Sequence, residues 1–73
     1  MKQKTKNKLF ELWAWCDEMD KSTEFMFQYM SDMSGLDYDE VVAFICNTEE
    51  AERSDWYKNN PDWYKKYPEI NQT

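Results

Sequence analysis

The stretch Tyr-Asp-Glu-Val-Val-Ala-Phe-Ile-Cys at residues 38–46 is the most apolar run in the chain and decides the predicted fold. Tyr38, Val41 and Ile45 recur at the spacing of one helical face, and the neighbouring Val42 widens it. The adjacent valines would also suit a strand, but the residues before them favour a helix. We therefore predict a central helix over 38–46, against which the rest of the chain packs.

Two patterns flank this stretch and define where helices begin and end. Asp37, followed three residues later by Glu40, is typical of a capped helix start, and acidic residues there suit the positive end of the helix dipole. Gly35, which follows Ser34, predicts the end of an earlier helix because glycine adopts the left-handed conformation at little cost.

Composition limits the fold class. The chain has 73 residues, which suits one small domain over 1–73. One Gly and two Pro are too few for an all-β fold with many tight turns. Four Trp, five Tyr and four Phe exceed what one small core needs, so some rings should lie at the surface. We predict an all-α domain of three to four helices, with a helix-turn-helix-like middle and an aromatic C-terminal segment.

The first third of the sequence predicts one helix from about Thr5 to Met19. The basic start at residues 1–8 is either flexible or forms the first turns of this helix. Phe10 and Trp15 fall beside the apolar face and either cover its flank, which we favour, or contact a partner. The predicted face repeats at helical spacing and consists of Leu9, Leu12, Trp13, Cys16 and Met19.

A second helix is predicted from about Thr23 to Met33, capped by Asp20 or Ser22. A face rich in Met and aromatic rings serves either as core, which we favour, or as an adaptable binding groove. The predicted buried side is Phe25, Met26, Tyr29, Met30 and Met33.

From Ser31 to Phe44 the spacing resembles a helix-turn-helix in shape. The second helix of that unit would present Asp37, Asp39 and Glu40, where a DNA reader needs Arg, Lys, Asn or Gln. Phosphate would repel these carboxylates, so we expect the unit to contact protein instead.

Charge is unevenly distributed along the chain, whose net charge is −6. Residues 1–10 carry four Lys and no acid, whereas residues 11–55 carry thirteen acids against Lys21 and Arg53. Glu49, Glu50 and Glu52 form an acidic face, for which simple solvation is the alternative interpretation. An acidic middle disfavours nucleic acid and favours a partner with a basic surface.

The clearest internal repeat is Asp-Trp-Tyr-Lys-x-x-Pro, which occupies residues 55–61 and again 62–68. Asn60 before Pro61 predicts a cap and one or two helical turns, which Pro68 ends, and residues 69–73 are predicted to be loose. The Trp rings of the repeat either close the core as lids or, with the adjacent Tyr rings, form a partner contact.

The sequence lacks the residues that catalytic, cofactor and metal sites usually require. The chain has no His, no phosphate-binding Gly loop and two Cys thirty residues apart, so we predict no catalytic, cofactor or metal site and no enzyme activity. With neither a membrane-length apolar run nor a signal-peptide pattern, we expect a cytoplasmic protein. Cys16 and Cys46 are then reduced core thiols, with a disulfide between them as the alternative.

These observations predict a small acidic protein-binding module, an inhibitor or adaptor that occupies a basic surface of a partner protein, such as a nucleic-acid-binding one. One alternative is a nucleic-acid binder that uses the arm of Lys2, Lys4, Lys6 and Lys8, and another is a homodimer. The predicted contact residues are Asp37, Asp39, Glu40, Glu49, Glu50, Glu52, Trp56, Tyr57, Trp63 and Tyr64.

Overall fold

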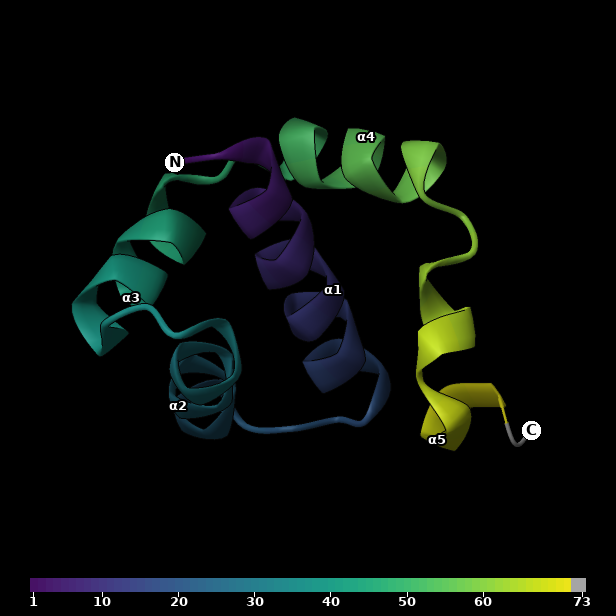
Figure 1. Ribbon diagram of the computed structural model, residues 1–73, viewed down its shortest axis with the longest axis horizontal. Helices are drawn as coiled ribbons and strands as arrows, with labels where there is room; N and C mark the ends of the chain where they lie inside the picture. Colours follow the sequence, from purple (N-terminus) through teal and green to yellow (C-terminus); the bar gives the residue numbers. More distant parts are fainter. Residues whose placement is uncertain (72–73) are drawn as a thin grey trace.

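The computed structural model describes residues 1–71 and confirms the all-α fold, since no strand occurs in that part of the chain (Figure 1). None of the helices in these residues has both the length and the apolar content that a membrane span requires. In order, the elements are α1 (Gln3–Glu18), α2 (Thr23–Ser34), α3 (Tyr38–Asn47), α4 (Glu50–Asn59), the 3₁₀ helix η1 (Trp63–Lys66) and the single turn α5 (Pro68–Asn71).

Residues 38–46 are helical, as predicted, and lie in α3. The helix at the centre is α1, however, so the predicted central position of 38–46 is wrong. Figure 1 shows α1 between α2 and α3 on one side and η1 and α5 on the other, while α4 crosses near its N-terminal end. In α3 only Val41 is fully buried, because that helix packs chiefly on α2. A helix with neighbours on several sides must be apolar nearly all round. The buried residues of α1 are accordingly Leu9, Phe10, Leu12, Ala14, Trp15 and Cys16.

The N-terminal residues are helical from Gln3, which fits the alternative in which the basic start forms the first turns of the helix. The Gln3 side chain donates to Asn7 Oδ1 at 2.9 Å, one turn along the helix. Phe10 and Trp15 are 2% and 9% exposed, which confirms that they cover the flank of the helix.

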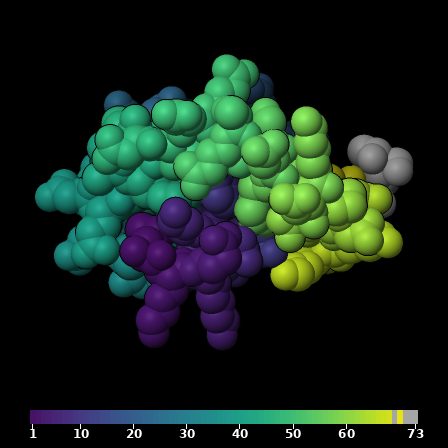
Figure 2. Space-filling model, turned by 90° about the horizontal axis from the view of Figure 1, so that it is seen from above, coloured from purple at the N-terminus to yellow at the C-terminus, as the bar shows by residue number. Residues whose placement is uncertain are grey.

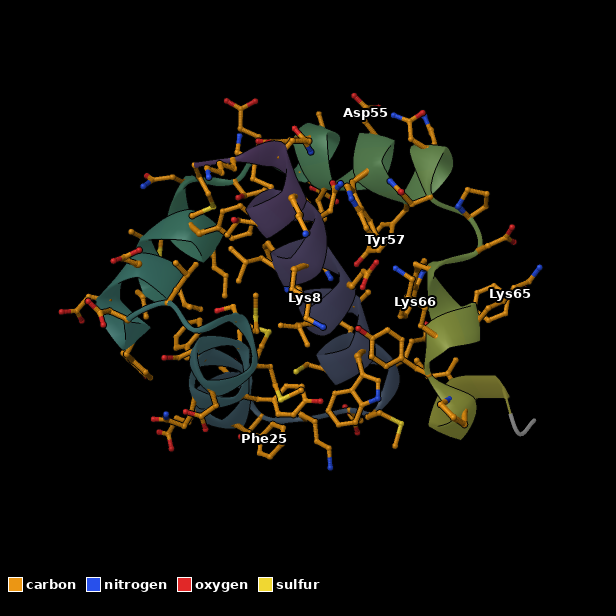
Figure 3. All side chains as sticks on the ribbon, in the orientation of Figure 1. Lys8, Phe25, Asp55, Tyr57, Lys65 and Lys66 are labelled. Atoms are coloured by element: carbon orange, nitrogen blue, oxygen red, sulfur yellow. The ribbon has the colours of Figure 1, made fainter. Side chains whose placement is uncertain are left out.

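Helix α2 begins after Ser22, whose Oγ accepts from the Phe25 backbone N–H at 3.1 Å and makes this residue the cap. Met26 and Met30 are buried as predicted, but Phe25 and Met33 are 42% and 51% exposed. Because α2 packs on α1 and α3 with one side only, its outer residues stay in solvent, as Phe25 does in Figure 3.

The turn between α2 and α3 follows the predicted helix-turn-helix-like pattern. Gly35 has φ 79°, and its N–H donates to the Ser31 carbonyl at 3.0 Å, which ends α2 as expected. Ser31 Oγ also donates to the Leu36 carbonyl at 2.7 Å and holds the turn. Asp37 is the residue before α3, although its side chain makes no capping hydrogen bond.

The C-terminal segment departs from prediction at its prolines. Asn60 ends α4 instead of capping a new helix, and its Nδ2 donates to the Trp56 carbonyl at 2.8 Å. Pro68 begins α5 instead of ending a helix, because its fixed φ suits a first helical position. The predicted loose end at 69–73 overlaps α5 at residues 69–71, and residues 72–73 lie outside the described residues.

Both cysteines are free thiols in this structure. Cys16 lies in the core, as predicted, and its pKa rises to about 11 because burial and the neighbouring Asp17 charge disfavour the thiolate. Cys46 is exposed, so its predicted core position is wrong. It lies in the last turn of α3.

Candidate functional site

Arg53 fastens α4 to α1. Its guanidinium lies 4.0 Å from the centroid of the Trp13 ring and donates to the Tyr57 hydroxyl from Nε at 3.1 Å and Nη2 at 2.8 Å. It also forms an ion pair with Asp17. The planar guanidinium contacts a ring, donates to a hydroxyl and pairs with a carboxylate at the same time. A Lys ammonium would not reproduce this combination.

Tyr57 takes part in this contact as an acceptor. Burial raises the pKa of the Tyr57 hydroxyl above its usual value, and the nearby Arg53 opposes that shift without cancelling it. The hydroxyl is therefore protonated at neutral pH. Figure 3 shows Tyr57 on the side of α4 that faces α1, whereas Asp55 points away from the rest of the molecule.

Beside Arg53 lies a hollow of about 500 Å³, here called the acidic hollow. It is formed where the C-terminal half of α1, one face of α4 and the start of η1 meet. Three carboxylates, those of Asp17, Glu18 and Glu50, and the rings of Tyr57 and Trp63 make it acidic and aromatic. Its lining consists of Ala14, Asp17, Glu18, Glu50, Arg53, Ser54, Tyr57, Pro61 and Trp63.

The acidic hollow suits a basic side chain. Arg53 already neutralises Asp17, but within residues 1–71 neither Glu18 nor Glu50 forms an ion pair. The Tyr57 and Trp63 ring centroids are 6.5 Å apart, so both rings lie near these carboxylates. Carboxylates and aromatic faces together bind guanidinium and ammonium groups, as Arg53 illustrates within the chain.

Three of the ten predicted contact residues, Glu50, Tyr57 and Trp63, come together in this hollow. Trp56 does not, because it is 6% exposed, stacks on Phe10 with centroids 5.5 Å apart and donates from Nε1 to Asn7 at 3.0 Å. Trp56 is thus a core lid, the alternative that the sequence left open, and its ring is not accessible to a partner.

The other predicted residues lie elsewhere on the surface. Asp37, Asp39 and Glu40 are exposed around the first turn of α3, and Glu49 and Tyr64 are exposed at the start of α4 and in η1. Their carboxylates come from the starts of two helices, α3 and α4.

Glu40 and Glu52 line a second hollow of about 390 Å³ together with Met1, Lys6 and Phe44. Figure 2 shows the first residues of α1 lying between α3 and α4 at this end of the molecule. Lys6 Nζ is 3.7 Å from a Glu52 carboxylate oxygen, an exposed pair of small energetic value.

Sequence reasoning missed Asp17, Glu18 and Arg53 as members of the site. Arg53 and Tyr57 are separated by one helical turn, which is the one local signal that could have indicated their contact. The approach of Asp17 and Glu18 to α4 depends on the packing of two helices far apart in sequence, which no local pattern reports.

Comparison with protein-family models, with curated proteins and with solved structures found no match. Of the Cys, Asp and Glu side chains that the structure describes, no group of three or more lies where it could hold a metal ion. We therefore infer function from the side chains that the fold brings together.

Proposed function

We propose that this chain is a small acidic protein-binding module that acts as an inhibitor or adaptor by occupying a basic surface of a partner protein in the cytoplasm. The observation that carries the proposal is the acidic hollow, in which Glu50, Tyr57 and Trp63 meet Asp17 and Glu18. Binding of this kind needs no catalytic step.

In the proposed contact, an Arg or Lys side chain of the partner enters the acidic hollow. Glu18 and Glu50 neutralise its charge, and the rings of Tyr57 and Trp63 cover its apolar stem. The net charge of −6 steers a basic surface toward the module, an effect that salt weakens. A partner that ordinarily binds nucleic acid has such a surface. The exposed acids outside the hollow add to this long-range attraction.

The test compares three tagged baits in parallel captures from the native host at moderate salt, followed by mass spectrometry. The baits are the wild type, the double variant Glu18→Lys/Glu50→Lys and the control Asp55→Lys, which changes an exposed acid of α4 outside the hollow. We expect one protein to be retained by the wild type and the control and lost by the double variant.

With that protein purified, the double variant should bind at least about tenfold more weakly, a loss of about 1.4 kcal/mol or more. A further variant, Asp39→Lys/Glu40→Lys, tests the acids of α3 and should have the smaller effect, since these acids lie outside the hollow. Failure to retain any protein, or equal retention by all three baits, contradicts the proposal.

The nucleic-acid alternative has less support, because the four N-terminal lysines do not form one arm. Lys6 lines the hollow with Glu40 and Glu52, whereas Lys4 and Lys8 line a hollow on another side of α1. A long polyanion crossing α3 would also meet exposed Asp37 and Asp39.

A further inference from the structure

A third hollow, of about 490 Å³, lies between α1 and η1 and is here called the basic hollow. Its charge is opposite to that of the acidic hollow and of the chain as a whole. Lys4 and Lys8, one turn apart on α1, meet Lys66 of η1 there. Figure 3 shows Lys66 directed toward α1, where Lys8 also lies, whereas Lys65 points outward.

The positive charge of this hollow exceeds its negative charge. Glu11 is its one carboxylate among the described residues, and Lys66 Nζ donates to it at 2.8 Å. The Glu11 side chain is 13% exposed and also accepts from the Tyr67 hydroxyl at 3.4 Å. Its negative charge is therefore largely buried and is offset by Lys66. Among the side chains that the structure describes, Lys4 and Lys8 have no ion-pair partner, so their positive charges are not offset.

The floor of the hollow also offers an oriented amide. Asn7 Oδ1 accepts from Trp56 Nε1 at 3.0 Å and from Gln3 Nε2 at 2.9 Å. These two contacts fix which end of the amide is oxygen, so the Nδ2 group keeps its two donors. No hydrogen bond within residues 1–71 uses that group, and Asn7 lines the hollow.

We propose that the basic hollow is a binding site for the phosphate group of a small phosphorylated molecule. Lys4 and Lys8 would neutralise the phosphate, and Asn7 Nδ2 would donate to one of its oxygens. The volume lies within the range of small-molecule pockets and leaves room for the group that carries the phosphate. Tyr67 lines the same hollow and offers that group a ring.

A small ligand fits the charge distribution better than a nucleic acid does. Within about 8–10 Å, the screening length near physiological salt, a phosphate in the hollow responds mainly to the local lysines. A long polyanion would extend beyond that range and meet the excess of carboxylates on the rest of the chain.

The experiment follows backbone amide shifts of the ¹⁵N-labelled full chain by NMR at low ionic strength. Inorganic phosphate and adenosine monophosphate are titrated separately, with adenosine as the neutral match. We expect saturable shifts confined to the first half of α1 and to η1, with adenosine monophosphate binding more tightly than phosphate and adenosine causing none.

Lys4→Gln/Lys8→Gln should weaken binding at least about tenfold, whereas Lys58→Gln, which removes an exposed lysine outside the hollow, should leave it unchanged. The amide spectrum of each variant shows directly that it is folded. Shifts that do not saturate, or equal binding by the double variant, overturn the proposal.

A short single-stranded oligonucleotide distinguishes the source of the phosphate. If it binds more tightly than adenosine monophosphate and with a steep salt dependence, the site reads nucleic acid and the small-ligand proposal is wrong. Protein capture through the acidic hollow is tested by other variants, so either proposal can fail without the other.

Discussion

The two copies of Asp-Trp-Tyr-Lys-x-x-Pro adopt different structures although they follow each other directly. Residues 55–61 form the second half of α4 and its end, whereas residues 62–68 contain the 3₁₀ turn η1. Trp56 of the first copy lies in the core and is 6% exposed. Trp63 of the second copy is only partly buried against the core. Tyr57 of the first copy accepts a hydrogen bond from Arg53, whereas Tyr64 of the second copy is 36% exposed.

The difference shows that the neighbours of a short motif determine its structure. The first copy continues a helix that begins at Glu50, so its residues add to hydrogen bonds already formed. The second copy follows Pro61, which lacks an N–H and disfavours a helical residue before it. Between Pro61 and Pro68 there is room for only a short 3₁₀ turn.

The largest effect expected from this comparison is at the two Trp residues. Trp56→Ala removes a buried ring, its stacking on Phe10 and its hydrogen bond to Asn7, and should cost about 3–5 kcal/mol of unfolding free energy. Trp63→Ala should cost about 1–2 kcal/mol, because its ring is only partly buried.

Urea unfolding followed by circular dichroism measures both values. A domain of this size has only a few kcal/mol of stability, so the Trp56 variant should be largely unfolded without denaturant. Equal costs at the two positions would show that the copies are energetically equivalent despite their different burial.

The second effect concerns Tyr57, whose raised pKa links stability to alkaline pH. Because the folded state disfavours tyrosinate, stability is fully present below the unfolded pKa of 10.0 and falls as pH rises from there through the higher folded pKa. Tyr57→Phe removes this group, so stability of the variant should decline less above pH 10 than stability of the wild type.

At neutral pH the same variant loses the hydrogen bonds from Arg53 and should be destabilised by about 1 kcal/mol. Urea unfolding at neutral pH and above pH 10 gives both quantities. Parallel declines of the variant and the wild type would contradict the assignment of the alkaline effect to Tyr57.

The smallest effect is expected at the adjacent lysines of the second copy. Lys66→Gln removes the ion pair with Glu11 and should cost about 0.5–1 kcal/mol, because the Lys end is exposed while the Glu end is largely buried. Lys65→Gln loses only an exposed pair with Asp62 and should change the free energy of unfolding by less than about 0.5 kcal/mol.

Thermal unfolding at low and high salt distinguishes these two variants. The difference in stability between the two variants should shrink only slightly with added salt, because the Glu11 side chain is largely buried. A larger loss for Lys65→Gln would mean that η1 is held to α1 by something other than the Glu11 contact.

Local chemistry explains which parts of the fold could be predicted. Gly35 at its positive φ and Ser22 as a cap act through the backbone within a few residues, so the bounds of α2 and the start of α3 follow from sequence. The choice of central helix does not, because 38–46 is more apolar than α1 but has fewer neighbours. Burial depends on which elements surround a helix, and that information is not local.

The same distinction applies to the acidic hollow. Glu50, Tyr57 and Trp63 were predicted as contact residues from their charge and ring type, without any indication that they meet. Arg53 and Asp17 were not predicted, because their contact joins residues 36 positions apart. Trp56 and Trp63 lie in the same motif, and the sequence alone does not show that the first ring enters the core while the second is only partly buried.

The position of α1 in the chain has a consequence for synthesis on the ribosome. This helix is made before every element that covers it, and the hydrogen bond from Trp56 to Asn7 joins residues 49 positions apart. The contact of Tyr67 with Glu11 spans 56 positions. While the nascent chain emerges, Asn7 and Glu11 of α1 therefore lack these partners until Trp56 and Tyr67 have been made.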